Sequence, residues 1–166
     1  MPMRSLVFVC TGNVCRSPMA EHLLRRRLGP GSDWDVSSAG TSGGYGLPAS
    51  RTAVEALDEI GLDLSSHRSR PLTREAVDDA SLVVVMTADH RDFIRAVSPG
   101  AMEKIFLLRS FDPAGAGDIE DPIGSSADTY RRVRDEIDRA LPGLVSFMET
   151  LELPGEKRPG PRRNDG

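Results

Sequence analysis

A short segment near the start of the chain carries residue types suited to phosphate chemistry. Residues 10–17 read Cys-Thr-Gly-Asn-Val-Cys-Arg-Ser, so a cysteine is followed by five residues, an arginine and a serine. A cysteine thiolate is a strong nucleophile, and an arginine presents a planar fork of N–H donors that matches two oxygens of a phosphate group. The spacing therefore indicates attack of the Cys10 sulfur on a phosphate held by Arg16, with the Ser17 hydroxyl able to donate a hydrogen bond to the same sulfur.

The elements around this segment are those that an anion site requires. Leu6 to Val9 form an apolar, β-rich run, and Ser17-Pro18 predicts a helix that begins at Pro18 with Ser17 as its N-cap. A loop before a helix N-terminus directs backbone N–H groups at an anion, and the helix dipole favours negative charge there. This field would also favour the thiolate form of Cys10. We therefore expect the whole loop to bind phosphate: Thr11, Gly12, Asn13, Val14, Cys15, Arg16 and Ser17.

Strands and helices alternate along the rest of the chain, which is typical of a parallel sheet. Further strands are predicted at Trp34–Ser38, Leu82–Met86 and Lys104–Leu108, and further helices at Ala49–Ile60, at Asp89–Val97 and from Tyr130 to Leu151, where Pro142 predicts a kink or a break. We expect an α/β fold: a single three-layer domain over residues 1–153, with a four-stranded parallel sheet, helices on both faces and the phosphate loop between the first strand and first helix. Residues 154–166 are expected to form a disordered basic tail.

Composition excludes several classes of protein. The chain has 166 residues, 39% of them hydrophobic, two cysteines and a net charge of −4. These values do not fit a disordered chain or a disulfide scaffold, and no apolar run approaches the roughly 20 residues of a membrane-spanning helix. The net charge gives no reason to expect a nucleic-acid partner. We expect a cytoplasmic protein without a membrane partner, and the oligomeric state is left open between a monomer and a weak dimer.

The segment VCTGNVCRSP resembles the signature of the low-molecular-weight protein-tyrosine-phosphatase family, particularly its bacterial members. The resemblance covers about residues 4 to 151 and includes Ser38-Ala39-Gly40, the SSHRSRPL segment around His67, the LVVVM strand and a late Asp-Pro pair. It implies a phosphoprotein phosphatase that needs no metal or other cofactor. In this family Cys10 corresponds to the nucleophile and Arg16 to the phosphate clamp.

The resemblance also implies roles for residues that spacing does not assign. Asn13, Ser17, Ser38 and His67 correspond to a polar network that holds the loop in shape. Cys15 corresponds to a cysteine that forms a reversible, protective disulfide with the nucleophile, although a small buried side chain is the alternative for this residue.

The resemblance implies a general acid and base in the long loop 109–126, which contains several acidic residues. Spacing alone leaves Asp112, Asp118, Glu120 and Asp121 as equal candidates. The family resemblance selects Asp121, which precedes Pro122.

Two other kinds of site fit the residues less well. A zinc site that uses Cys10, Cys15 and one histidine would lack a second pair of ligands. Arsenate reductases share the fold and the nucleophile, but they need further cysteines, and none follows Cys15.

Substrate choice depends on the rim of the pocket. Tyrosine-specific members of the family have aromatic residues after Asp-Pro, whereas this chain has Ile123 followed by Gly-Ser-Ser, a run similar to that of the protein-arginine-phosphatase members. Those members have threonine where this chain has Val14, an apolar residue as in the tyrosine type. Tyr45 is either a second rim residue or an exposed loop aromatic. We expect a phosphotyrosine phosphatase, with a protein-arginine phosphatase as the alternative and a non-catalytic phosphate-binding or redox-sensing module as the second alternative.

Overall fold

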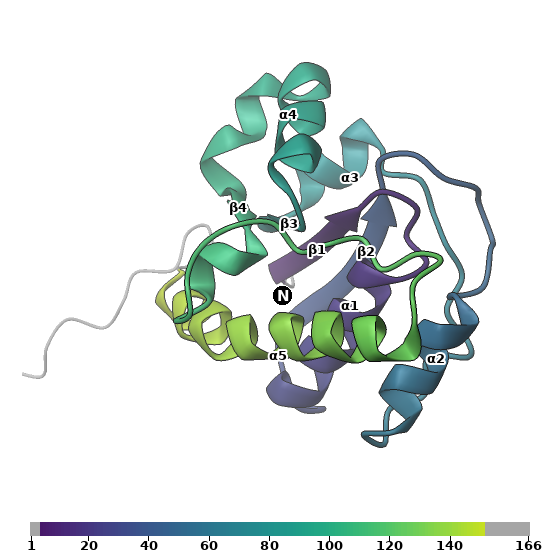
Figure 1. Cartoon of the computed structure of the whole chain (residues 1–166). Coiled ribbons are helices and arrows are strands. Elements are labelled where there is room, and N and C mark those ends of the chain that lie inside the picture. Colours follow the sequence, from purple (N-terminus) through teal and green to yellow (C-terminus); the bar gives the residue numbers. More distant parts are fainter. Residues whose placement is uncertain (1–3, 152–166) are drawn as a thin grey trace, which may run out of the picture.

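Four parallel strands form the centre of the molecule. The computed structural model describes residues 4–151, and its strands are β1 (Arg4–Cys10), β2 (Trp34–Gly40), β3 (Leu82–Val85) and β4 (Ile105–Leu107). They lie in the order β2-β1-β3-β4, and every pairing is parallel (Figure 1). The prediction of a four-stranded parallel sheet is confirmed, with small shifts at the strand ends.

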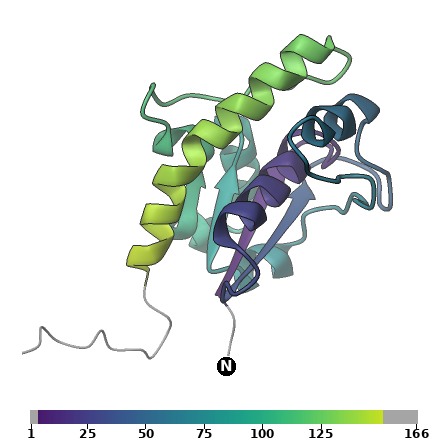
Figure 2. The ribbon, with the colours of Figure 1, turned by 90° about the horizontal axis from the view of Figure 1, so that it is seen from below.

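Helices cover both faces of this sheet. Helices α1 (Arg16–Leu28), α2 (Arg51–Asp58) and α5 (Ala127–Thr150) lie on one side, and α3 (Arg74–Asp79), α4 (Ala88–Val97) and the 3-10 helix η1 (Pro99–Lys104) lie on the other (Figure 1). A second 3-10 helix, η2 (Leu108–Phe111), follows β4. Figure 2 shows α1 and α5 side by side over the sheet.

Alternate residues of β1 pack into the two hydrophobic cores on opposite faces of the sheet. Leu6 and Phe8 belong to the core under α1, α2 and α5, whereas Val7 and Val9 belong to the core under α3 and α4. This follows from the two-residue period of a strand. The three-layer prediction is confirmed.

The predicted start of the first helix is wrong by two residues. Helix α1 begins at Arg16, with Cys15 at the N-cap position and no side-chain cap. Pro18 therefore lies inside the first turn, where an N–H group has no partner within the helix and its absence is tolerated. Ser17 does not cap the helix because its hydroxyl group is used inside the loop, as described below.

Two other helix predictions also need correction. Helix α2 is shorter than the predicted Ala49–Ile60. It begins at Arg51, because Ser50 acts as its N-cap and accepts a hydrogen bond from the backbone N–H of Ala53, and it ends at Asp58. Helix α3 was not predicted at all. Its six residues are too few to show a helical period in the sequence.

Pro142 does not break the last helix. Helix α5 continues from Ala127 to Thr150 with Pro142 inside it. A proline cannot donate to the carbonyl group four residues earlier, which is that of Asp138. The Nη2 atom of Arg27 on α1 donates to this carbonyl oxygen at 3.4 Å. A tertiary contact therefore replaces part of the lost helical hydrogen bond.

The predicted tail at residues 154–166 lies outside the described residues, and the domain bounds of 1–153 stay a prediction. Within residues 4–151, no helix combines the length and the apolar character that crossing a membrane would need.

Candidate active site

The segment between β1 and α1 has the geometry of an anion-binding loop. Asn13 has a φ of 57°, the left-handed conformation expected for a glycine or asparagine in such a loop. Within residues 4–151, no group accepts a hydrogen bond from the backbone N–H groups of Gly12, Asn13, Val14 or Cys15. Four consecutive N–H groups at the start of a helix are therefore available to the oxygens of a bound anion.

The residue at the end of β2 that packs against this loop, Gly40, must be small. A Cβ atom on Gly40, at the end of β2, would lie 2.5 Å from the carbonyl oxygen of Thr11. Gly40 therefore permits the phosphate loop to run against the end of β2. This explains why the Ser38-Ala39-Gly40 segment accompanies the loop.

The side chain of Asn13 connects the loop to neighbouring elements. Its Nδ2 atom donates to the hydroxyl oxygens of Ser17 and Ser38, both at 2.9 Å, and its Oδ1 atom accepts from the backbone N–H of Arg70 at 2.9 Å. Ser38 in turn donates to Glu21 at 3.1 Å. Asn13 is fully buried, and these contacts use both N–H groups of its side-chain amide and the amide oxygen. The left-handed turn is thus held from three sides.

His67, in the segment between α2 and α3, supports the same turn. Its Nε2 atom donates to the carbonyl oxygen of Asn13 at 2.7 Å. Burial lowers the pKa of His67, so the ring is neutral at neutral pH. The structure therefore brings together all four members of the expected network, with His67 in a structural position.

The hydrogen bonds around Ser17 have a direction that suits a nucleophilic sulfur. The Ser17 oxygen lies 2.9 Å from the Cys10 sulfur. Because the Asn13 amide nitrogen can only donate, the Ser17 oxygen accepts that hydrogen bond and its own hydrogen is free for the sulfur. A thiolate at Cys10 would therefore receive a hydrogen bond from Ser17.

The Arg16 guanidinium is held by two hydrogen bonds and has one N–H group without a partner. Its Nη1 atom donates to the carbonyl oxygen of Ile119 at 2.9 Å, and its Nη2 atom donates to Thr11 Oγ1 at 3.3 Å. Its Nε atom is buried and has no partner among the described residues. The Nε atoms of Arg4, Arg91 and Arg109 are also buried without a hydrogen-bond partner within residues 4–151, but of the four arginines only Arg16 lines the cavity of Cys10. The Arg16 Nε atom lies in the same segment as the free N–H groups of the loop, so it is available to donate to an oxygen of a phosphate group.

The structure separates the four acidic candidates of the long loop. Asp112 has a fully buried side chain that accepts two hydrogen bonds from Arg139, each at 2.9 Å. Asp118 accepts from the backbone N–H of Ala88 at 3.0 Å.

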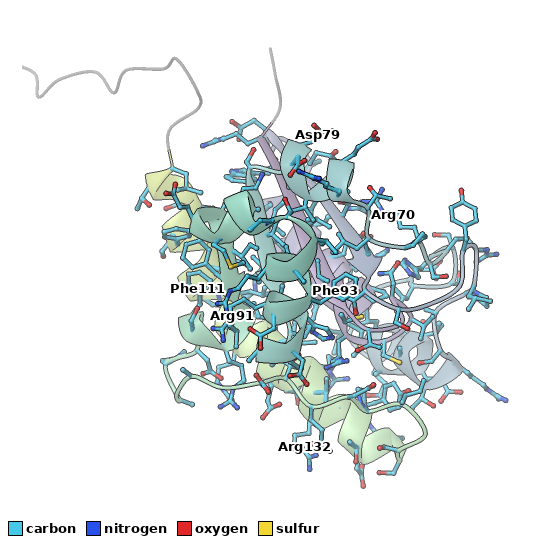
Figure 3. All side chains as sticks on the ribbon, turned by 90° about the horizontal axis from the view of Figure 1, so that it is seen from above. Arg70, Asp79, Arg91, Phe93, Phe111 and Arg132 are labelled. Atoms are coloured by element: carbon cyan, nitrogen blue, oxygen red, sulfur yellow. The ribbon has the colours of Figure 1, made fainter. Side chains whose placement is uncertain are left out.

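The remaining two candidates lie closer to the end of the same loop. Glu120 pairs with Arg132 at 2.6 Å, and Figure 3 labels this arginine on α5. Asp121 alone of the four lines the cavity that contains Cys10, and its Oδ2 atom lies 3.6 Å from Arg16 Nη2. Its Oδ1 atom accepts from the backbone N–H of Ile123 at 3.1 Å.

The cavity above the loop has a volume of about 190 Å³. Its apolar walls are formed by Val14 and Ile123. Tyr45 does not line it and is 84% exposed, so the two expected rim residues are not brought together in this conformation. A role for Tyr45 at the rim stays a prediction.

Cys15 lies in a buried cluster of hydroxyl groups. Its sulfur is 3.3 Å from Ser50 Oγ and 3.4 Å from the Tyr130 hydroxyl group, and Ser50 donates to Tyr130 at 3.2 Å. Burial raises the pKa of Cys15 and raises the pKa of Tyr130 to about 12. Cys15 is therefore a protonated thiol at neutral pH. Both cysteines are free in this structure.

Sequence reasoning missed two residues that support the site: Ile119, which contacts Arg16, and His90, which contacts Thr11. Ile119 is fully buried, and its backbone N–H donates to the carbonyl oxygen of Met86 at 2.8 Å, which anchors the long loop beside β3. The available signal was an apolar residue flanked by two acidic ones, Asp118 and Glu120, within a glycine-rich loop. His90 contacts Thr11 at 2.9 Å, and no sequence signal connects these two residues.

Metal ligands do not gather in the part of the chain that the structure describes. Within residues 4–151, no three histidine, cysteine, aspartate or glutamate side chains form a group that could hold a metal ion.

Comparisons with known proteins agree with this geometry. The family described as "Low molecular weight phosphotyrosine protein phosphatase" matches residues 5–154. The chain is 41% identical to a protein-arginine-phosphatase of Geobacillus stearothermophilus over 90% of this chain and 99% of the relative. It is 35% identical to the low molecular weight protein-tyrosine-phosphatase Etp of Escherichia coli K12 over 84% and 91%. The solved structure of the YwlE arginine phosphatase from Geobacillus stearothermophilus superimposes with a TM-score of 0.80 at 40% identity, and the match covers 89% of this chain and 94% of that one. The chain therefore belongs to the low molecular weight phosphotyrosine protein phosphatase family.

Proposed function

We propose that the protein hydrolyses phosphotyrosine in protein substrates through a cysteinyl-phosphate intermediate on Cys10. The observation that carries this proposal is the loop itself, which brings together a sulfur with a hydroxyl donor, four free N–H groups and an unpartnered guanidinium N–H, and whose Cys10 and Arg16 line one cavity. Such preorganised donors stabilise the charge that develops on a transferring phosphoryl group.

In the first step the Cys10 thiolate attacks phosphorus. The bond from phosphorus to the phenolic oxygen breaks, and the electron pair of that bond stays on the oxygen. Asp121, in its carboxylic acid form, gives this oxygen a proton, so that the leaving group departs as a neutral phenol. Arg16 and the loop N–H groups hold the three remaining phosphate oxygens.

In the second step a water molecule attacks the cysteinyl phosphate. Asp121, now a carboxylate, accepts a proton from the water, the bond from phosphorus to sulfur breaks, and the Cys10 thiolate is restored as inorganic phosphate leaves. The position of Asp121 at the edge of the cavity, 3.6 Å from Arg16, supports this double role.

The walls of the cavity favour an aromatic substrate. Val14 and Ile123 are apolar and offer no acceptor to a guanidinium group. A phosphoarginine side chain that lost a polar partner there would bind less well by about 1–3 kcal/mol. The second candidate function, hydrolysis of protein phosphoarginine, is favoured by the high identity to relatives named as protein-arginine-phosphatases.

One comparison of substrates tests the choice. Two peptides of the same sequence, one with phosphotyrosine and one with phosphoarginine, would be supplied to the purified protein, and kcat/KM would be measured for each. We expect a higher value for phosphotyrosine. The variant Val14→Thr should shift the ratio toward phosphoarginine. A wild-type preference for phosphoarginine would establish the second candidate instead.

The same proposal includes a protective role for Cys15. A peroxide would transfer one oxygen atom to the Cys10 thiolate to form a sulfenic acid, with hydroxide (or alkoxide) as the leaving group. The Cys15 sulfur would then attack the Cys10 sulfur to form a disulfide, and the departing hydroxide would leave as water with the proton of the Cys15 thiol. We expect Cys15→Ser to lose the recovery of activity that a thiol reductant gives to the peroxide-treated wild type. Recovery of the variant to the wild-type level would exclude this role.

The proposal also covers the partner of the protein, its location in the cell, its domain bounds and its oligomeric state. We propose a phosphorylated protein as the partner, a cytoplasmic location, a catalytic domain over residues 1–153, and a protein that is a monomer or a weak dimer and binds no nucleic acid. Family membership supports the phosphoprotein partner. Gel filtration at several protein concentrations would test the oligomeric state.

A further inference from the structure

His90 is a buried histidine whose hydrogen bonds fix its tautomer. It lies on α4, is 4% exposed, and uses both ring nitrogens. Its Nδ1 atom lies 3.2 Å from the backbone nitrogen of Thr87, which can only donate. Nδ1 is therefore the acceptor, and the hydrogen of the neutral ring is on Nε2. Burial and the positive charge of Arg16 lower the pKa of His90 to about 4, which keeps the ring neutral at neutral pH.

The direction of this hydrogen bond determines the role of the Thr11 hydroxyl group. His90 Nε2 lies 2.9 Å from Thr11 Oγ1 and therefore donates to it. Arg16 Nη2, which also can only donate, lies 3.3 Å from the same oxygen. Two accepted hydrogen bonds occupy both lone pairs of a hydroxyl oxygen. The hydrogen of Thr11 must then point away from both partners.

Thr11 stands between two cavities. It lines the cavity of Cys10, and with Arg16 and Asp121 it also lines a neighbouring cavity of about 440 Å³ that includes His90 and Phe93. Figure 3 labels Phe93 on α4. His90 does not line the Cys10 cavity, and its hydrogen bond to Thr11 joins its ring to a residue that does.

We propose that His90 is a positioning residue of the phosphate site, which holds the Thr11 hydroxyl oxygen as an acceptor for Arg16 and leaves the hydroxyl hydrogen free to be donated to an oxygen of the bound phosphate group. This inference rests on the proposed function for the identity of the anion. In this arrangement the Thr11 hydroxyl group adds one side-chain donor to the N–H groups of the loop. Its oxygen also gives Arg16 a second fixed contact besides the Ile119 carbonyl oxygen.

A pair of substitutions at His90 separates positioning from structural support. The amide nitrogen of glutamine in His90→Gln can reach the place of Nε2 and donate to Thr11. The shorter side chain of His90→Asn reaches only the place of Nδ1, so it keeps the contact with Thr87 and loses the contact with Thr11. Thr11→Val removes the hydroxyl group and keeps a side chain of similar shape.

Two measurements are needed for each variant: the Kd of inorganic phosphate by titration calorimetry, and kcat/KM for p-nitrophenyl phosphate. We expect His90→Asn to weaken phosphate binding about tenfold, the size expected for one lost hydrogen bond to a charged group, and His90→Gln to stay within about threefold of the wild type. The double variant His90→Asn/Thr11→Val should equal Thr11→Val alone, because His90 acts through Thr11.

Three results would overturn the inference: unchanged phosphate affinity in His90→Asn, equal losses in His90→Asn and His90→Gln, or additive losses in the double variant. Melting temperatures would be recorded for all variants, and equal losses that follow melting temperature would assign His90 to structure alone. Failure of the proposed function is a separate outcome. A wild-type protein that binds phosphate but does not turn over p-nitrophenyl phosphate would refute the phosphatase mechanism and leave the role of His90 to be judged by the binding data.

Discussion

Replacement of Asn13 by alanine should destabilise the protein by about 3–4 kcal/mol. The change removes three hydrogen bonds, two buried ones to Ser17 and Ser38 and a partly buried one to the backbone of Arg70, each worth about 1 kcal/mol. It also places an alanine at a φ of 57°, a conformation that asparagine tolerates better by up to about 1 kcal/mol. For a chain of this size, the loss corresponds to a fall in melting temperature of about 10 °C.

Urea unfolding of the wild type, Asn13→Ala and Asn13→Gly would separate the two contributions. Both variants lose the three hydrogen bonds, but glycine adopts the left-handed conformation without strain. Asn13→Gly should therefore be more stable than Asn13→Ala by about 1 kcal/mol. A loss below about 1 kcal/mol for Asn13→Ala would refute the estimate of the network. Equal stability of the two variants would refute the argument from backbone strain.

Three further predictions concern the titratable side chains of Asp121, His90 and Asp112. Asp121→Asn should slow turnover about 100-fold for aryl phosphates with poor leaving groups and much less for good ones; Asp118→Asn is the matched control, and a larger effect there would assign the general acid to Asp118. Because the pKa of His90 is lowered to about 4 from an ordinary value of about 6.5, its contribution to stability is fully present above pH 6.5 and is lost as the pH falls toward 4. Urea unfolding of His90→Gln across this range should show a flatter pH dependence than the wild type, and identical profiles would contradict the assignment. Asp112→Asn should cost about 2 kcal/mol, because a fully buried carboxylate that pairs with Arg139 loses its charge, yet it should leave kcat/KM unchanged; a large loss of kcat/KM would show that Asp112 contributes to the site.

Much of the fold could be predicted from the sequence, because strands that are buried on both faces of a parallel sheet consist of short runs of apolar residues. Leu6–Val9 and Leu82–Met86 both show this pattern, and the glycine and asparagine of the loop fit its left-handed turn. Helix ends were harder to predict. Ser17 matches the residue preference of an N-cap, but its hydroxyl group is used by Asn13 and Cys10 instead.

The candidate site was predictable where its residues are consecutive in the chain, and less so where distant segments meet. The loop 10–17 forms a single site because one turn of backbone places all of its residues together. The contact of His90 with Thr11 joins residues 79 positions apart, and no local sequence pattern predicts such a contact. Tyr45 shows the opposite case, since its position in a loop beside Gly12 did not place its ring at the cavity.

The central claim is that phosphate passes through the sulfur of Cys10. The most direct test is to quench the wild type in acid during turnover of a radioactive aryl phosphate and to locate the label by peptide mapping, with Cys10→Ser as the control. We predict labelled phosphate on the peptide that contains Cys10 and no turnover by Cys10→Ser. Label on another residue, or turnover by Cys10→Ser at the wild-type rate, would contradict the mechanism.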